Sequence, residues 1–167
     1  MKQFLLALLL AAPVLFSSCS KEETTVSGIN SIEYGKRLPV SKSDLVKYEI
    51  LRNLTDGQYQ YIVFKNNAAG VLITNLSDVP QSYAYCTQWG VSNNTLTMVT
   101  DKGVTQTFDV SKEYKKISES SYTITVYLKG SDGKEYAYDC VDDGTNSAVA
   151  ATVWNVINTA RSSQPVG

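Results

Sequence analysis

The residue types available for catalysis are restricted, because the 167-residue chain contains no histidine. Ser-His-Asp and Cys-His nucleophilic systems, His-ligated zinc and His-ligated haem are therefore excluded in their usual forms. The sequence has neither a Gly-x-x-x-x-Gly-Lys phosphate loop nor a Gly-x-Gly-x-x-Gly fingerprint after a strand. The segment 142–146 is rich in oxygen ligands, but it lacks EF-hand spacing and is more typical of a turn with a helix cap. We expect no enzymatic activity, no cofactor and no metal site.

Tyrosine is the most frequent aromatic residue, with eleven copies, most of which lie in the strand-like segments. Alternation along a strand places Tyr59 and Tyr61 on one face of their segment, and Tyr83 and Tyr85 on one face of theirs. Such a surface can bind sugars, lipids or a protein, because tyrosine joins an apolar ring to a polar tip. The same pattern is also typical of half-buried strands without a ligand. If the chain has a ligand site, the candidates are Tyr59, Tyr61, Tyr83, Tyr85 and Trp89.

The first eighteen residues have the pattern of a cleavable export signal. Lys2 gives a positive start, residues 4–15 form an apolar run, and small residues precede Cys19. The run is shorter than the roughly 20 apolar residues of a transmembrane helix. Removing residues 1–18 leaves 149 residues, a size that suits one domain, and changes the net charge from −1 to −2 because only Lys2 is lost. This balance does not resemble the basic surface of a nucleic-acid binder.

The residues around the cleavage point resemble those of bacterial lipoproteins. Ser17-Ser18-Cys19 resembles a lipobox, with Phe16 where leucine is usual, and Ser20-Lys21-Glu22-Glu23 resembles the acidic export signal of Bacteroidota-type lipoproteins. The resemblance implies a lipid on Cys19 and a place in the cell envelope, on the outer membrane and at its outer surface. We expect residues 19–32, which are small and polar, to be the lipidated N-terminus and a flexible tether to the membrane.

Two cysteines remain once Cys19 carries lipid. Cys86 and Cys140 lie in strand-like segments, and exported proteins fold in an oxidising compartment. The sequence therefore favours a disulfide between them, which would restrict the unfolded chain by about 4 kcal/mol in the entropic model. Two buried thiols are the alternative.

The rest of the chain, residues 33–167, has the pattern of one β domain. Short alternating segments recur about every ten residues between Gly, Asn and Asp turns, which is typical of an antiparallel meander closing into a barrel or a sandwich. The expected strands are 46–54, 58–65, 71–76, 82–89, 95–100, 104–110, 122–128 and 134–141. Val149, Val153, Val156, Ile157 and Ala160 then share one helical face, which predicts a C-terminal α-helix at about 146–161.

The later strands resemble those of small bacterial lipocalin-like domains. The matching features are Trp89 before Asn93-Asn94-Thr95-Leu96-Thr97-Met98, the segment Tyr122–Tyr127, Asp132-Gly133-Lys134-Glu135-Tyr136 and the helix that follows. The lipocalin Gly-x-Trp is absent near the first strand, where Leu45-Val46-Lys47-Tyr48 stands. The resemblance implies an all-β barrel that binds a small ligand.

Three classes of function remain open at this point. The least favoured is an enzyme, such as a carboxylate hydrolase, which would need a cleft with converging carboxylates or an activated Tyr or Lys. The other two are kinds of binding protein. A ligand-binding module requires an aromatic or apolar cavity open to solvent, and would take a small apolar ligand or a glycan. A protein-interaction lipoprotein, such as an accessory subunit or an immunity or inhibitor protein, would have a filled barrel and a conspicuous exposed patch. The sequence favours the ligand-binding module.

Overall fold

The computed structural model describes residues 32–54, 57–75, 80–142 and 148–163. The expected signal peptide, Cys19 and nearly all of the tether lie outside these residues, as do the expected helix-capping residues between 143 and 147.

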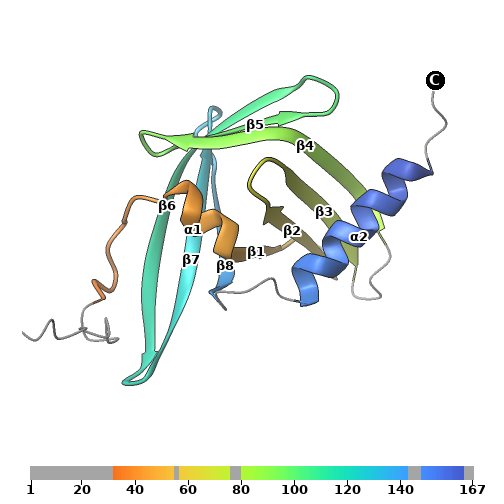
Figure 1. Cartoon of the computed structure of the whole chain (residues 1–167). Coiled ribbons are helices and arrows are strands. Elements are labelled where there is room, and N and C mark those ends of the chain that lie inside the picture. The colour runs from red at the N-terminus through yellow and green to blue at the C-terminus, as the bar shows by residue number, and fades with distance from the viewer. Residues whose placement is uncertain (1–31, 55–56, 76–79, 143–147, 164–167) are drawn as a thin grey trace, which may run out of the picture.

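The fold is a closed antiparallel barrel of eight strands in sequence order, with one helix after it, which confirms the predicted all-β barrel with a C-terminal helix (Figure 1). Each strand pairs with its neighbours in the chain, and β1 closes the barrel against β8. A short helix that the sequence reading did not include, α1, precedes the first strand. The elements are α1 (Lys42–Lys47), β1 (Tyr48–Asn53), β2 (Gln58–Phe64), β3 (Ala69–Asn75), β4 (Pro80–Ser92), β5 (Thr95–Thr100), β6 (Thr105–Ser118), β7 (Ser121–Gly130), β8 (Glu135–Asp142) and α2 (Ala148–Ser162).

The middle of the barrel is packed with side chains. Strand alternation turns every second residue inward, so that Ile50 of β1 lies beside Ile62 of β2 and Cys140 of β8 in the register. Apolar residues at these inward positions form one continuous buried cluster. Its fully buried members include Ile50, Leu96, Met98, Val110, Ile124, Val126 and Leu128.

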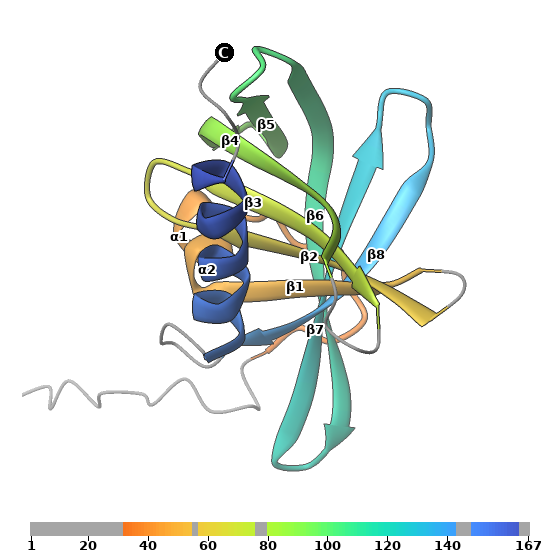
Figure 2. The ribbon, with the colours of Figure 1, turned by 90° about the vertical axis from the view of Figure 1, so that its right-hand side faces the viewer.

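Helix α2 lies on the outside of the barrel and covers β2, β3 and β4 (Figures 1 and 2). Val153 and Ile157 of the predicted apolar face are buried, and Trp154, which that prediction did not include, is buried beside them. All three pack on Val63 and Leu72. Many of the helix residues are β-branched, so the helix depends on this packing rather than on intrinsic propensity. Its first turn is held to the barrel by the Ala150 amide, which donates to the Glu49 carboxylate at 3.2 Å.

The β6–β7 hairpin extends beyond the rest of the barrel (Figures 1 and 2). β5 pairs with β6 only as far as Asp109, whereas β7 pairs with it to Ser118. The chain entering the domain runs beside the remaining edge of β6: Gly35 donates to the Tyr114 carbonyl, and Leu38 exchanges two backbone hydrogen bonds with Lys112. These contacts cover an edge that would otherwise present unpaired backbone groups.

None of the helices in the described part of the chain is long and apolar enough to cross a membrane.

Candidate functional site

The two ends of the barrel differ. Helix α1 covers one end, and the turns that join β1 to β2 and β7 to β8 lie at the other (Figure 2). At the end under α1, Leu45 is fully buried and packs into the barrel core together with Val40. We call this the closed end, and the opposite one the open end.

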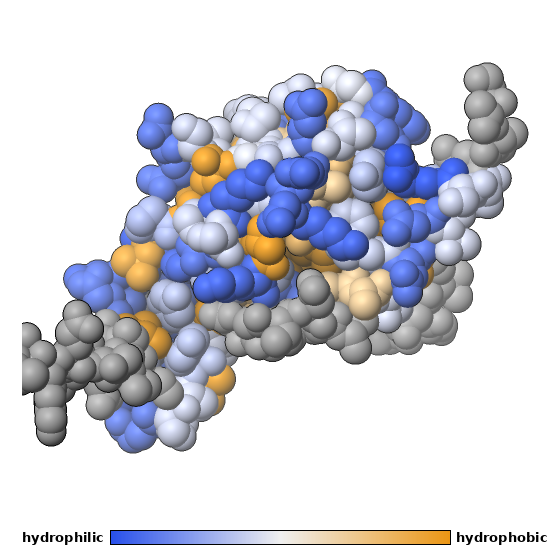
Figure 3. All heavy atoms as spheres, viewed as in Figure 1, coloured by the Kyte–Doolittle hydropathy of each residue, from blue (hydrophilic) through white to orange (hydrophobic). Residues whose placement is uncertain are grey.

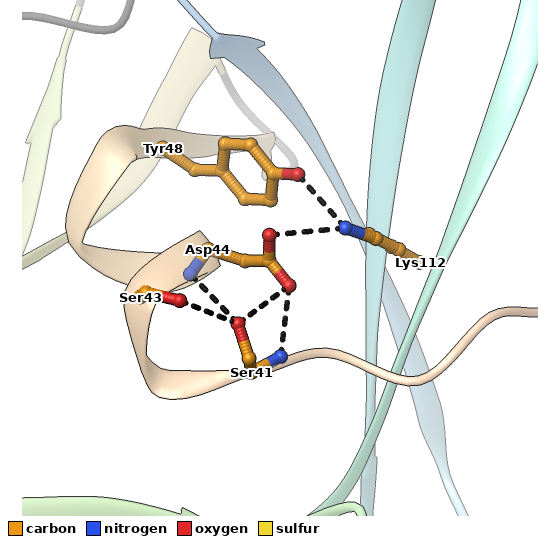
Figure 4. A network of polar contacts seen from close by, with 5 residues as sticks. All are labelled: Ser41, Ser43, Asp44, Tyr48 and Lys112. Atoms are coloured by element: carbon orange, nitrogen blue, oxygen red, sulfur yellow. Dashed lines mark hydrogen bonds and ion pairs between the residues drawn. The ribbon is translucent and has the colours of Figure 1, made fainter. Parts of the chain in front are cut away.

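A polar network holds the closed end together (Figure 4). Ser41 and Asp44 form a capping box at the start of α1, in which the Asp44 amide donates to the Ser41 hydroxyl and the Ser41 amide donates to the Asp44 carboxylate. Lys112 reaches the same carboxylate at 3.1 Å and donates to the Tyr48 hydroxyl at 3.2 Å. The side chains of Lys112 and Asp44 are 12% and 25% exposed, so water screens this pair only in part.

The network changes the pKa of both charged groups. Burial disfavours the Asp44 carboxylate, but hydrogen bonds from Ser41 and the charge of Lys112 outweigh burial and hold the pKa of Asp44 below its usual value. Burial likewise disfavours charged Lys112, and contact with Asp44 outweighs it and raises the pKa of the lysine. Asp44 and Lys112 are paired with each other, so the network serves to fix α1 over the core.

At the open end the inward positions become polar. The register aligns Arg52 of β1 with Gln60 of β2, Gln60 with Ile73 of β3, and Ile73 with Ser82 of β4. All four face the interior, because they lie two residues beyond the packed row of Ile50, Ile62, Val71 and Ala84. Arg52, Gln60 and Ile73 are half-buried, and Ser82 is exposed. The barrel is therefore filled in its middle and open at this rim.

A cavity of about 520 Å³ lies at the same end, at the point where β4 and β5 separate. The pairing of β4 with β5 ends at Cys86 and Thr100, next to an irregularity in the register, and the last backbone contact is the Asp101 amide donating to the Tyr85 carbonyl at 2.9 Å. The strand pairing of residues 80–84 of β4 is with β3 alone. The cavity occupies the space between this part of β4 and the β5–β6 turn. It is lined by Ser82, Tyr83, Ala84, Tyr85, Thr100, Asp101, Lys102, Val104 and Gln106.

Of the five predicted aromatic residues, the structure brings Tyr61, Tyr83 and Tyr85 to one cluster under α2 on the outside of the barrel, and it places Trp89 in the barrel core. Tyr59 and Tyr61 alternate along β2 with Gln60 and Ile62. Because Gln60 and Ile62 point inward, the two tyrosines lie on the outer face of the strand. Tyr83 and Tyr85 also face outward; they line the rim of the cavity and pack against the cluster under α2. Trp89 points inward instead: it packs on Phe64 at 4.6 Å between ring centroids and donates to the Lys65 carbonyl. The register shift between Cys86 and Gln88 explains why Trp89 faces the core.

The predicted disulfide is wrong in the structure. Cys86 and Cys140 are both buried thiols of the barrel core, and they are not bonded to each other. They belong to β4 and β8, which are four strands apart in the eight-strand barrel, so the packed core separates them. A disulfide requires Cα atoms closer than about 7 Å. Cys140 instead donates to the Ile124 carbonyl at 3.1 Å.

Arg52 is the site residue that the sequence reading missed. The signal was present, because alternation along Tyr48–Asn53 places Arg52 on the same face as Tyr48 and Ile50, and a charge on an apolar face is unusual. Its guanidinium lies 4.4 Å from the centre of the Tyr136 ring and 5.3 Å from that of Tyr138. Burial raises the pKa of the Tyr138 phenol despite the opposing charge of Arg52, so Tyr138 remains a neutral hydrogen-bond donor.

Within the described segments no group of three or more His, Cys, Asp or Glu side chains could hold a metal ion. Comparisons with protein-family models, with curated proteins and with solved structures each found no match. The case for a function therefore rests on the geometry of the barrel.

Proposed function

We propose that the chain is a lipid-anchored binding module of the cell envelope, which takes a small ligand with an apolar body at the open end of its barrel. The observation that carries the proposal is the cavity of about 520 Å³ beside β4. Its volume is within the range of small-molecule sites. Polar side chains that could orient a ligand line this cavity, among them Ser82, Asp101 and Gln106. Arg52 and Gln60 do not line it; they lie in the row of inward residues that continues from Ser82 through Ile73 across β3 to β2 and β1.

An apolar ligand is favoured over a glycan because the Tyr85 ring at the cavity is already covered by other side chains. Sugars stack on exposed flat rings, whereas the Tyr85 ring is already covered by the Arg161 guanidinium at 3.6 Å and meets Trp154 edge-on. Inside the barrel at this end, the Arg52 and Gln60 side chains are joined by a hydrogen bond of 2.8 Å.

Two observations support a lipid anchor: the sequence around Cys19, and the path by which residues 32–41 enter the barrel. The export signal and lipobox-like residues place the lipid at Cys19. Residues 20–32 reach at most about 45 Å when fully extended. The described chain enters along β6, next to the extended β6–β7 hairpin, so that hairpin lies on the membrane side of the domain.

The ligand site is tested with N-phenyl-1-naphthylamine, an uncharged apolar dye that fluoresces on leaving water. All described elements lie within residues 32–163, so a chain beginning at residue 20 keeps every described contact. We expect saturable fluorescence enhancement that Ala84→Phe, which fills the cavity from an inward position of β4, weakens by about tenfold. Ala137→Phe adds the same ring to an exposed position of β8 and is the matched control. Absence of saturable binding by the wild-type chain would refute the proposed site.

The packed middle of the barrel favours a second candidate, a protein-interaction lipoprotein. On the face seen in Figure 3 hydrophilic residues predominate and apolar surface forms only small separate patches. A stable interface usually has a larger continuous core, so this face does not support the second candidate. It would become the leading function if the dye does not bind.

A further inference from the structure

Within the described part of the chain, little balances the charge of Arg52. Its Nη2 donates to the Gln60 side-chain oxygen at 2.8 Å, and the Tyr138 hydroxyl donates to that same oxygen at 2.9 Å. The Nε atom is buried and has no hydrogen-bond partner. A guanidinium has five N–H donors, so most of its donor capacity is unused by the protein.

Two other cations that contact the barrel are paired with carboxylates. Lys112 contacts Asp44 at the closed end, and Arg37, which stacks on Tyr127 outside the barrel, contacts Glu113 and Glu135. No carboxylate in the described segments forms an ion pair with Arg52. The faces of Tyr136 and Tyr138 attract the guanidinium, but an aromatic ring offers no acceptor to the Nε–H group.

We propose that Arg52 binds an anionic group of the ligand, so that the open end takes an organic anion with an apolar body, such as a carboxylate or a sulfonate. This inference rests on the proposed function, because the anion would enter through the same open end. The planar fork of a guanidinium pairs with two oxygens of such a group, and Tyr136 and Tyr138 hold the fork in place at one rim of the barrel. Gln60 orients both Arg52 and Tyr138 through one oxygen.

The test compares two dyes that differ in charge. 8-Anilinonaphthalene-1-sulfonate carries a sulfonate, whereas N-phenyl-1-naphthylamine has the same ring system without it. We expect Arg52→Met, which keeps an unbranched stem, to raise the Kd for the sulfonate at least about tenfold and to leave the Kd for the neutral dye within about twofold. Arg37→Gln removes the same charge from a tyrosine-stacked arginine outside the barrel, and should change neither Kd.

A second variant covers the case in which Arg52→Met does not fold. Arg52→Lys keeps the charge and loses the fork, so we expect it to weaken sulfonate binding by about three- to tenfold without affecting the neutral dye. If the wild-type chain binds the neutral dye and both Arg52 variants bind the sulfonate as tightly as the wild type, the assignment of Arg52 is wrong and the proposed site stands. If the wild-type chain binds neither dye, both proposals are wrong.

Discussion

Charged side chains inside the barrel have different partners at its two ends. Lys112 at the closed end is paired with Asp44, and both belong to a network in which nearly every polar atom has a partner. Arg52 at the open end has only an amide oxygen and two ring faces. Burying a charge is costly unless it is paired, so the first arrangement stabilises the fold. For the second, we propose that a ligand supplies the missing partner.

The Asp44–Lys112 pair makes stability depend on pH in a direction that can be measured. The pKa of Asp44 is lower in the folded than in the unfolded chain, so its stabilising contribution is present above the unfolded pKa and is lost as pH falls through the folded one. Asp44→Asn should lower the free energy of unfolding at pH 7 by about 1–2 kcal/mol, as part-buried pairs do, and less at pH 3.

Urea unfolding at the two pH values checks this difference. Glu119→Gln, in an ion pair with Lys116 whose glutamate is 90% exposed, is the matched control and should change stability by less than about 0.5 kcal/mol. An Asp44→Asn effect that is equal at pH 7 and pH 3 would show that the charge of Asp44 contributes nothing.

The two core cysteines should be thiols in the folded protein, even in an oxidising compartment. Burial, and after it the negative charge of Asp101, raises the pKa of the Cys86 thiol, so little thiolate is available for oxidation. Protein purified without reductant should react with iodoacetamide at Cys86 and Cys140 only after denaturation. A mass lower by two hydrogen atoms, together with no labelling of the denatured chain, would reveal a disulfide and contradict the structure.

Among the elements, α2 depends on one close approach to the sheet. A Cβ atom on Gly70 of β3 would lie 2.5 Å from the Ile157 Cδ1 atom, and Ile157 is fully buried. Gly70→Ala should therefore destabilise the protein by about 1–3 kcal/mol, as overpacking does. Gly90→Ala places the same methyl group where nothing lies within 4 Å, and should be neutral or slightly stabilising. Urea unfolding followed by tryptophan fluorescence compares the two; equal effects would refute the role of Gly70.

The segment before α1 protects the long edge of β6. A chain that begins at Val40 loses the backbone contacts of Gly35 and Leu38 with β6, and leaves that edge without a partner. We expect such a chain to self-associate on size-exclusion chromatography, whereas a chain that begins at residue 32 stays monomeric at the same concentration. Two chains that elute alike would show that the segment has no protective role.

Much of this architecture could be predicted from local patterns. Turn residues and alternation gave the strand order, and the apolar spacing of Val153, Ile157 and their neighbours gave α2. Helix α1 was missed although Ser41 and Asp44 have the spacing of a capping box, because only six residues follow the cap. Simple alternation along β4 does not predict that Trp89 faces the core. A register irregularity before Trp89 changes which side chains point inward, and it leaves no clear mark in the sequence.

Considered as a whole molecule, the barrel has a packed middle, a closed end under α1 and an open end beside the cavity. The chain enters along β6 near the extended hairpin, so a lipid on Cys19 would hold that side toward the membrane. Cys19→Ser should abolish acylation and release the protein from the membrane fraction, with mass spectrometry of the N-terminal peptide as the readout. A lipid-free N-terminal peptide from the wild-type protein would contradict the anchor.

The central claim is that the open end of the barrel binds a small ligand, and backbone NMR of the chain from residue 20 tests it most directly. Titration with N-phenyl-1-naphthylamine should shift amide signals of residues 82–85 and 100–106, together with Arg52 and Gln60, and should leave those of α1 unchanged. Shifts that are confined to the outer face under α2, or no saturable shifts at all, would contradict the account.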